Sequence, residues 1–418
     1  MKQQIEGSQA VATVVAFCRP EVMACYPISP QTHIVETLSQ KVKAGEVGTC
    51  QFLNVESEFA ALSVLIGASA MGARAYTATT SQGLLFMAEA VYNAGGLGLP
   101  IVMTIANRAV GAPINIWNDH SDSMAMRDAG WIQLFAENNQ EAVDLHIQAF
   151  RLAEELSCPV MVCMDGYILT HAFELVDLPT QEQVDDYLPP FEPVQVLDPL
   201  NPISIGAMVG PDAFMEVRYL AHDKHIRALE AISRTSEAFH EQFGRMSGGL
   251  LESYHTEGAE TIIVALGSVN GTIKDAIDEL RLAGLSVGSI KISSYRPFPT
   301  HAFHEVVKDA KRILVIEKDL AVGKGGIVSS DVRMAVQNLP LVVMTVIAGL
   351  GGRAIPKSSI VRIVREACLE GLEEPHFLDL NWNAVNDEFV RQQKKRRSGL
   401  IPKNIPGDVG PFKLKVGQ

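Results

Sequence analysis

Short apolar runs alternate with longer stretches of helical periodicity through the first 170 residues. A helix places apolar residues every three or four positions, whereas a strand buried on both faces is a nearly continuous apolar run. Strands are predicted at Val22–Tyr26, Phe52–Val55, Ala73–Thr77, Pro100–Ala106 and Pro159–Met164. Helices are predicted between them at Ser57–Met71, Gly83–Ala94 and Gln140–Leu156. This alternation predicts an α/β domain with a mostly parallel sheet that helices cover on both faces.

The same alternation returns after residue 246 and predicts a second, smaller α/β domain. Its strands are predicted at Thr261–Leu266, Ser286–Ile292, Ile313–Ile316 and Leu341–Val346. Residues 179–202 are rich in proline and acidic side chains, which disfavours regular structure, and a long charged helix is predicted at Ala213–Phe243. We therefore predict a first domain at residues 1–245, with the connection and the helix at 179–245, and a second domain at 246–370.

Periodicity fades after Gly371, so residues 371–418 are predicted to form an irregular C-terminal arm. The arm carries the basic run Lys394–Arg397. Two interpretations stay open for it, a solvated tail or an arm that lies on a partner subunit.

Charge and cysteine usage narrow the class of protein. The chain of 418 residues has a formal net charge of −13, which argues against nucleic acid or an anionic membrane as its main partner. Its longest apolar run is far shorter than the ~20 residues that span a bilayer, and its first residues do not resemble a signal peptide, so we expect a soluble cytoplasmic protein. The six cysteines form no C-x-x-C pair. We expect buried thiols, no metal site in this chain, and any iron–sulfur cluster on another chain.

Four polar segments interrupt the first domain, each where a predicted strand ends. They are Tyr26–Pro30, Ser57-Glu58, Thr79–Gly83, and Asn107-Arg108 with the following Ile114–His120. In an open parallel sheet the loops at the carboxyl ends of the strands meet in one crevice. The four segments are therefore predicted to line a single site.

Glu58 is the first candidate for chemistry, because it begins an almost wholly apolar helix. One interpretation is a carboxylate that favours the positive end of the helix dipole, with Ser57 as the N-cap. The other is a desolvated carboxylate that shares a proton with a ring nitrogen of a bound cofactor.

Arg108 and Ser29 are the next candidates. Arg108 closes a predicted strand, so its guanidinium emerges at the carboxyl edge of the sheet. It pairs either with Asp119 or Asp122 downstream, or with the carboxylate of an acidic substrate, which suits its planar fork. Ser29 lies between two nearby prolines that fix the direction of its hydroxyl group.

These segments together resemble a known family. The matching sequences are Tyr26-Pro27-Ile28-Ser29-Pro30, Val55-Glu56-Ser57-Glu58, Thr79-Thr80-Ser81-Gln82-Gly83-Leu84, Asn107-Arg108, Ala112-Pro113-Ile114-Asn115-Ile116-Trp117-Asn118-Asp119 and Tyr295-Arg296-Pro297-Phe298-Pro299. In this order they resemble the alpha subunit of pyruvate:ferredoxin oxidoreductase and its 2-oxoacid relatives, over roughly residues 5 to 365.

The resemblance implies a thiamine diphosphate enzyme, with a pyrimidine-binding domain followed by a domain similar to the transketolase C-terminal domain. Glu58 matches the family glutamate that contacts the aminopyrimidine ring, and Arg108 and Ser29 match positions that hold the substrate carboxylate. The remaining implied positions are Pro27, Ile28 and Gln82 for the cofactor, and Ala109, Val110, Ile114 and Ile116 for the substrate pocket.

This chain lacks half of such a site. The Gly-Asp-Gly stretch and downstream asparagines that hold magnesium and diphosphate are missing, and the nearest string is Met164-Asp165-Gly166-Tyr167. The resemblance therefore implies a hetero-oligomer of anaerobic metabolism. A beta subunit would hold the diphosphate and Mg²⁺, and gamma and delta (ferredoxin-like) subunits would carry [4Fe-4S] clusters. The implied reaction is the oxidative decarboxylation of a 2-oxoacid to acyl-CoA and CO₂, with coenzyme A as co-substrate and ferredoxin or an NAD-linked module as acceptor.

The substrate stays open between pyruvate and a bulkier 2-oxoacid. Pyruvate enzymes of the family usually carry Thr at Ser29 and a Ser-Leu-Ser-like stretch at Ala109-Val110-Gly111. Smaller side chains beside Arg108 would admit a branched-chain or aromatic acid such as phenylglyoxylate, although each methylene changes discrimination by only ~1–3 kcal/mol. The alternative is that these smaller side chains arose by neutral change and do not affect the choice of substrate.

Two further interpretations stay open for the whole chain. It could be a non-catalytic or assembly paralogue, or a transketolase-like carbon–carbon transferase. The runs Gly323–Gly326 and Gly349–Arg353 fit no phosphate-loop pattern. We expect turns there, with contact to a neighbouring subunit as the alternative.

Overall fold

The structure is a computed structural model that describes residues 2–393. One compact unit ends at His376, and a second begins at Phe377, so that the chain passes between them within β15 (His376–Phe377). No helix within the described residues is both long and apolar enough to cross a membrane.

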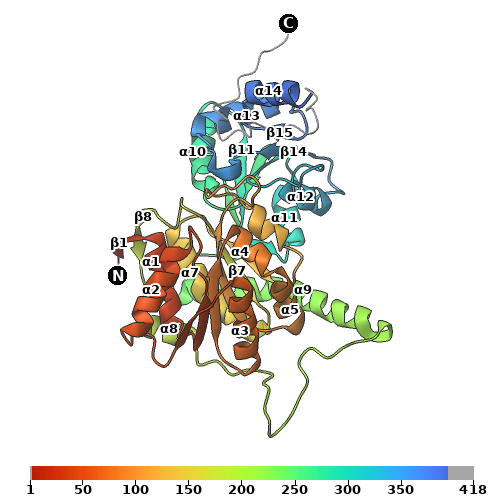
Figure 1. Cartoon of the computed structure of the whole chain (residues 1–418). Coiled ribbons are helices and arrows are strands. Elements are labelled where there is room, and N and C mark those ends of the chain that lie inside the picture. Colours follow the sequence, from red (N-terminus) through yellow and green to blue (C-terminus); the bar gives the residue numbers. More distant parts are fainter. Residues whose placement is uncertain (1, 394–418) are drawn as a thin grey trace, which may run out of the picture. The chain divides into compact units, whose positions relative to one another are not determined.

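A seven-stranded sheet forms the centre of the first domain (Figure 1). Its strands, in spatial order, are β12 (Ser294–Arg296), β6 (Ile132–Phe135), β7 (Val160–Asp165), β5 (Ile101–Asn107), β4 (Ala75–Thr79), β2 (Val22–Cys25) and β3 (Gln51–Asn54). All neighbours pair in parallel except β12, which runs antiparallel to β6. The predicted parallel sheet is confirmed. The short strand β6 was not predicted, nor was β12, which comes from the region assigned to the second domain.

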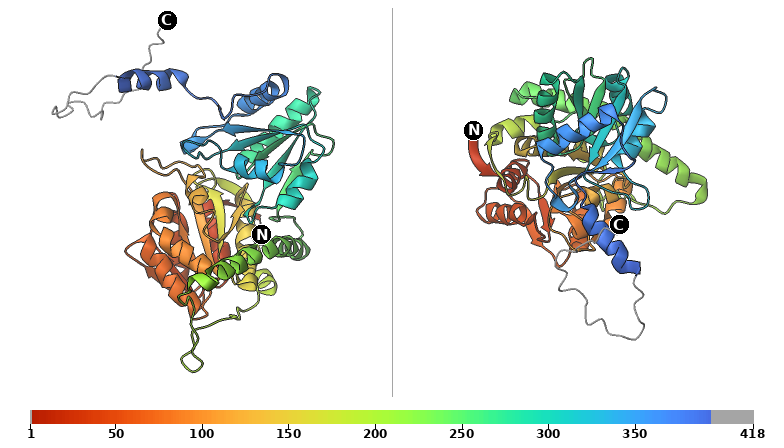
Figure 2. Two further views of the ribbon diagram at one scale, coloured as in Figure 1. Left: turned by 90° about the vertical axis from the view of Figure 1, so that its right-hand side faces the viewer. Right: turned by 90° about the horizontal axis from the view of Figure 1, so that it is seen from above.

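Helices cover both faces of this sheet, and Figure 2 shows the strands between the helical layers. The helices of the first domain are α1 (Gly7–Phe17), α2 (Thr32–Lys43), α3 (Glu58–Ala70), α4 (Ser81–Phe86), α5 (Ala88–Leu97), α6 (Ser121–Ala125), α7 (Asn139–Leu156), α8 (Gln181–Tyr187) and α9 (Pro211–Phe243). Side chains of a strand alternate between faces. Val102 accordingly belongs to the same buried cluster as Phe150 of α7, whereas the adjacent Met103 belongs to the cluster that contains Leu62 of α3. The predicted helix at Gly83–Ala94 is in fact two helices, α4 and α5, which meet at Met87.

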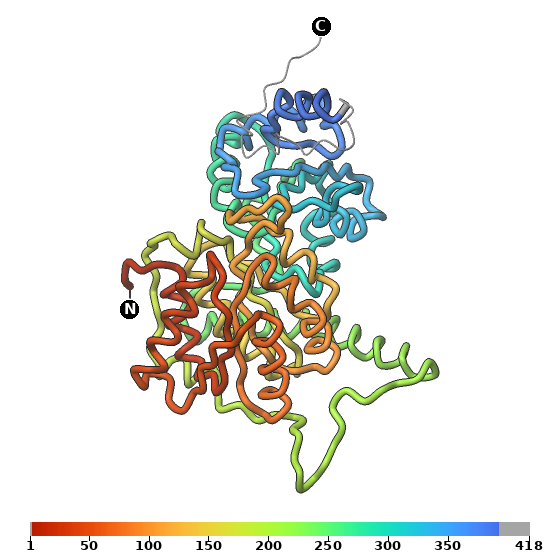
Figure 3. The backbone as a smooth tube through the Cα atoms, viewed as in Figure 1, coloured from red at the N-terminus to blue at the C-terminus, as the bar shows by residue number. Residues whose placement is uncertain are grey.

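The connection before α9 makes a long excursion from the body of the domain, which the tube in Figure 3 follows. Pro211 opens α9, where its missing N–H costs nothing, and Gly244 ends the helix in the left-handed conformation (φ 72°). A separate antiparallel pair, β1 (Lys2–Glu6) and β8 (Phe173–Asp177), ties the N-terminal segment to the chain that follows β7.

The second domain is built on the parallel strands β14 (Val342–Ile347), β13 (Arg312–Glu317), β10 (Thr261–Ala265) and β11 (Val287–Ile292), with β9 (Leu251–Tyr254) antiparallel beside β11. Its helical elements are α10 (Val269–Leu282), α11 (Thr300–Val307), α12 (Val328–Ala335), the 3₁₀ turn η1 (Leu350–Gly352) and α13 (Lys357–Leu369). Its core is continuous with that of the first domain, because Ile262, Ile290 and Tyr295 belong to the same cluster as Leu62 and Met103. The two domains therefore form one body.

The expectation of an irregular arm at residues 371–418 is wrong in part. Trp382–Gln393 forms helix α14, and the Asn381 side chain accepts a hydrogen bond from the Ala384 N–H at 3.2 Å, as an N-cap does. Lys394–Arg397 lie outside the described residues.

Candidate functional site

The four predicted polar segments lie at one edge of the first sheet, because β2, β3, β4 and β5 are parallel and end on the same side. Hydrogen bonds join the segments. The Thr80 hydroxyl donates to the Ala106 carbonyl oxygen at 2.5 Å, which links the ends of β4 and β5. The predicted convergence of these loops is therefore a property of the fold.

Gln31 fixes the loop after β2. Its fully buried amide donates to the carbonyl oxygens of Ala78 at 2.6 Å and Tyr26 at 3.2 Å, and accepts from the Ile28 N–H at 3.3 Å. Pro27 and Ser29 are exposed on this loop, and Ile28 is half-buried. Sequence reasoning missed Gln31, whose only signal was its place one residue after the Pro27–Pro30 turn.

Glu58 is buried at the start of α3, with 7% of its surface exposed. Ser57 caps the helix by accepting from the Ala60 N–H at 3.1 Å, so Glu58 is not needed as a cap. No hydrogen bond from any residue between 2 and 393 reaches the Glu58 carboxylate. A carboxylate that has no partner within the described residues is available to a ligand, which favours the interpretation that this group meets one.

Gly83 has no side chain that would crowd the Glu58 carboxylate. A Cβ atom at Gly83 would lie 2.7 Å from Glu58 Oε1 and 2.6 Å from Thr79 Oγ1, so any larger residue would displace one of them. Thr79 Oγ1 is itself buried and has no hydrogen-bond partner within the described chain. Two polar groups without partners therefore flank one glycine.

Arg108 is 5% exposed and pairs with neither Asp119 nor Asp122 through its guanidinium, so the expected alternative of an ion pair is not realised. Its Nε donates to the Asn115 carbonyl oxygen at 2.9 Å, and its Nη1 to the Ser29 carbonyl oxygen at 2.8 Å. Burial lowers the pKa of the Arg108 guanidinium from its ordinary value. A buried cation that touches only neutral carbonyls in the described part of the chain is suited to an anionic ligand.

Asp122 holds the loops after β4 and β5 together. It accepts hydrogen bonds from the backbone N–H groups of Ser81 at 2.9 Å, Arg108 at 3.0 Å and Ser123 at 2.7 Å, and from Asn107 Nδ2 at 2.8 Å. Burial raises the pKa of the Asp122 carboxyl, and the four donors oppose that rise. Its role is to position the backbone of Arg108, which sequence reasoning did not foresee.

The expected pocket residues are divided between the interior and the surface. Ala109 is buried, and its carbonyl oxygen accepts from the Ser81 hydroxyl at 2.6 Å. Val110 is half-buried, and so is Gln82, whose amide faces Gly111. Ile114 is 78% exposed and Ile116 is 41% exposed, so within this chain both lie on the surface of the loop.

The second domain supports this loop through η1. Asn115 Nδ2 donates to the Gly351 carbonyl oxygen at 3.1 Å, and the Gly351 N–H donates to Asp119 Oδ2 at 3.0 Å. A Cβ atom at Gly352 would lie 2.4 Å from Trp117 Cβ. The expected turn at Gly349–Arg353 is therefore present. It contacts the loop of this same chain in which the Asn115 carbonyl oxygen accepts a hydrogen bond from Arg108.

Asp165, in the string nearest to a diphosphate motif, joins the two domains. It contacts His120 Nε2 at 2.8 Å, Lys318 Nζ at 2.6 Å and the hydroxyl of Ser268. Although burial raises the pKa of Asp165, Lys318 and His120 hold it well below its usual range. Both carboxylate oxygens are occupied, so this residue is a structural ion-pair partner.

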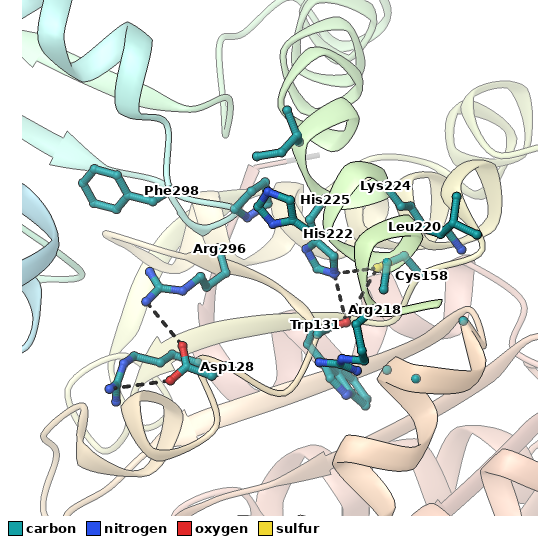
Figure 4. A pocket seen from close by; sticks show the side chains of 18 of the residues that line it. Asp128, Trp131, Cys158, Arg218, Leu220, His222, Lys224, His225, Arg296 and Phe298 are labelled. Carbon is teal, nitrogen blue, oxygen red and sulfur yellow. Dashed lines mark hydrogen bonds and ion pairs between the residues drawn. The ribbon is translucent and has the colours of Figure 1, made fainter. Parts of the chain in front are cut away.

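The large cavity in Figure 4 lies elsewhere. Its volume is about 630 Å³, and it is bounded by α9, by residues 296–298 and by Gly98, Gly130 and Cys158. The last three precede β5, β6 and β7, so this cavity is at the amino edge of the sheet. It is separate from Glu58 and Arg108.

The fold and the edge define a class. Two α/β domains share one body, and the first carries at its carboxyl edge a carboxylate and a guanidinium that form no ion pair within residues 2–393. Residues 13–236 match the family described as pyruvate flavodoxin/ferredoxin oxidoreductase, thiamine diphosphate-binding, and residues 259–360 match pyruvate:ferredoxin oxidoreductase core domain II. The chain belongs to the family of alpha subunits of the pyruvate:ferredoxin oxidoreductase type of 2-oxoacid oxidoreductase.

Among relatives, pyruvate synthase subunit PorA of Methanosarcina barkeri is 46% identical over 387 residues, which are 90% of this chain and 96% of that protein. Ketoisovalerate oxidoreductase subunit VorA of Pyrococcus horikoshii is 39% identical over 356 residues, 84% of this chain and 90% of that protein. The 2-oxoglutarate:ferredoxin oxidoreductase of Magnetococcus marinus has a similar fold, with a TM-score of 0.66 at 20% identity. That match covers 87% of this chain, which spans 65% of that protein's chain.

Proposed function

We propose that this chain is the alpha subunit of a coenzyme A-acylating 2-oxoacid:ferredoxin oxidoreductase that acts on pyruvate. The observation that carries the proposal is the presence, at one sheet edge, of the Glu58 carboxylate and the Arg108 guanidinium, neither of which forms an ion pair within residues 2–393. The names of the relatives support the reaction, and the higher identity to a pyruvate synthase subunit than to a ketoisovalerate one supports pyruvate.

The residues present fit the pyrimidine end of thiamine diphosphate. Glu58 offers a carboxylate oxygen, Gly83 has no Cβ that would crowd it, and Thr79 offers a hydroxyl group with no hydrogen-bond partner in the part of the chain that the structure describes. Pro27, Ile28 and Gln82 are the other residues that would hold the ring. When bound, thiamine diphosphate supplies the stabilised carbanion on which cleavage beside a carbonyl group depends.

Glu58, which begins α3 at the carboxyl edge of the sheet, would hydrogen-bond a nitrogen of the bound ring and would hold a proton at that contact. Arg108 binds the carboxylate of the 2-oxoacid with the part of its guanidinium that the two carbonyls leave free, and the Ser29 hydroxyl completes the contact. The main contribution of Arg108 is to orient the substrate before its carboxylate leaves as CO₂.

Partner chains supply the rest of the machinery. A beta subunit would hold the diphosphate and Mg²⁺, and gamma and delta subunits would carry the [4Fe-4S] clusters that supply electron transfer to ferredoxin or an NAD-linked acceptor. Coenzyme A captures the acyl group.

A bulkier substrate is the second candidate. Both residues beside Arg108 are small. The Ser29 carbonyl oxygen accepts from Arg108, and Ala109, the next residue in the chain, accepts from the Ser81 hydroxyl. The test is coenzyme A-dependent viologen reduction by the anaerobically purified complex with pyruvate, 2-oxoisovalerate, 2-oxoglutarate, indolepyruvate and phenylglyoxylate. Highest kcat/KM with pyruvate supports the first candidate, and highest kcat/KM with a branched or aromatic acid supports the second. An iron-free chain without thiamine diphosphate and without activity would favour a non-catalytic paralogue.

A further inference from the structure

Three side chains suited to metal binding meet where the N-terminal segment crosses the first domain. Glu6 ends β1, His33 lies in the first turn of α2, and His171 lies in the turn after β7. One ligand atom from each lies within 4.8 Å of the other two. Glu6 is buried, His33 is exposed and His171 is half-buried.

The backbone fixes the positions of Glu6 and His171. Glu6 is the register partner of Phe173 in the pairing of β1 with β8. The Gly7 N–H donates to the Ala172 carbonyl oxygen at 3.0 Å, and a Cβ atom at Gly7 would lie 2.1 Å from the Leu169 carbonyl oxygen. Two segments more than 160 residues apart in sequence are therefore held in close contact on either side of the cluster.

Hydrogen bonds also orient the histidine rings. His171 Nδ1 contacts Thr170 Oγ1 at 2.8 Å, and the same oxygen accepts from the Tyr167 N–H at 2.8 Å. When Nδ1 donates to this oxygen, Nε2 of His171 keeps its lone pair for a ligand, as in metal sites where a second contact sets the tautomer.

We propose that Glu6, His33 and His171 bind one divalent cation of the zinc class. Two imidazoles and one carboxylate form a common donor set for zinc, with water in the fourth position. His33 Nδ1 and Glu6 Oε1 are now 2.6 Å apart in a direct hydrogen bond. A tetrahedral zinc ion holds its ligand atoms about 3.3 Å apart, so the carboxylate and one ring shift slightly to admit the ion.

The ion ties three separate segments together close to the active-site loops. The His171 and Tyr167 rings pack at a tilt with centroids 4.5 Å apart, and the Tyr167 and Trp117 rings do so at 4.8 Å. Trp117 belongs to the loop that accepts from Arg108, and α2 follows directly on the loop that carries Ser29. The role of the ion is to steady this edge of the crevice, and the proposal does not depend on which 2-oxoacid is the substrate.

The test is the zinc content of the purified complex after equilibration with micromolar Zn²⁺ and dialysis, measured by mass spectrometry. His33→Asn and His171→Ala are compared with His301→Ala, which removes an exposed histidine at the start of α11. Any zinc bound by the iron–sulfur subunits of the complex contributes equally to all samples. A difference in zinc content between the variants therefore reports on this site.

We expect wild type and His301→Ala to hold one more zinc ion per alpha chain than His33→Asn and His171→Ala. Competition with a chromophoric chelator should give at least about tenfold weaker binding in the two site variants. Zn²⁺ should also raise the thermal midpoint of wild type and not that of His33→Asn, whose exposed position makes misfolding a poor explanation. Equal zinc in all four proteins would overturn the proposal and leave the Glu6–His33 contact as an ion pair only.

Discussion

Arg108 Nη1 donates to the carbonyl oxygen of Ser29 at 2.8 Å, which joins the loop after β5 to the loop after β2. The two residues that the resemblance assigns to the substrate carboxylate are thus in direct contact through the backbone of one and the side chain of the other. The guanidinium is placed by neutral acceptors and retains its charge for a ligand.

Replacing Arg108 with lysine should weaken substrate binding and leave the cofactor in place. Lysine keeps the charge but cannot donate to Asn115 and Ser29 and also present a fork to a carboxylate. We expect kcat/KM for the 2-oxoacid to fall at least about tenfold, which corresponds to about 1.4 kcal/mol, with unchanged thiamine diphosphate affinity by titration. Arg227→Lys, at an exposed position on α9, is the control. A large loss of cofactor affinity in Arg108→Lys would contradict this role.

Gly83→Ala should disable the cofactor site because its Cβ would lie 2.7 Å from Glu58 Oε1. Gly67→Ala is the matched control, since Gly67 lies inside α3 and a Cβ there meets nothing within 4 Å. We expect Gly83→Ala to lose most thiamine diphosphate binding. Gly67→Ala should keep full activity and gain stability, by about 0.5–1 kcal/mol from helix propensity. Equal cofactor binding by the two variants would show that the space in front of Glu58 is not used.

Gly351→Ala tests the support that the second domain gives to Arg108. The new Cβ would lie 2.5 Å from Asn115 Nδ2, whose carbonyl oxygen accepts from Arg108. Gly323→Ala has the same kind of positive φ and meets nothing within 4 Å, so it carries the backbone strain without the contact. We expect a rise in KM for the 2-oxoacid, several-fold larger in Gly351→Ala than in Gly323→Ala, with similar kcat. Identical KM values in the two variants would show that the contact between Gly351 and Asn115 does not affect substrate binding by Arg108.

The carboxyl edge could be predicted because it follows from the order of strands and loops. Parallel strands end on one side, so the polar segments after β2, β3, β4 and β5 had to converge, and Glu58 stood out as a charge in an apolar helix.

The contacts that stabilise this edge could not be predicted. Asp122 binds N–H groups from two loops, and Gly351 meets Asn115 from another domain, pairings that leave no periodic signal in sequence. The cluster of Glu6, His33 and His171 could not be predicted for the same reason, because its members come from three distant segments. Ile114 and Ile116 could not be placed from apolar character alone, since an apolar residue on a loop is buried only if a neighbour covers it.

Stability should depend on pH through Asp165. Lys318 and His120 depress the pKa of Asp165 in the folded chain below the value of about 3.9 for an unfolded aspartate. Its contribution to stability is therefore present above pH ~4 and is lost as the pH falls toward the folded pKa. Asp165→Asn should cost about 3–5 kcal/mol at pH 7, because Lys318 is left buried without its partner. The difference in thermal midpoint between wild type and Asp165→Asn should narrow below pH ~4, whereas a constant difference would contradict this assignment.

The Glu58 carboxylate is expected to serve the cofactor, because Ser57 already caps the helix. The most direct measurement is coenzyme A-dependent viologen reduction by complexes that carry Glu58→Gln or Ser57→Ala, with thiamine diphosphate content and thermal midpoint measured on the same samples. Glutamine fills the same space but cannot take up a proton. We predict that Glu58→Gln folds normally and loses at least about a hundredfold in kcat, whereas Ser57→Ala loses about 1 kcal/mol of stability with its cap and keeps its activity. Wild-type kcat in Glu58→Gln with cofactor bound would contradict the account.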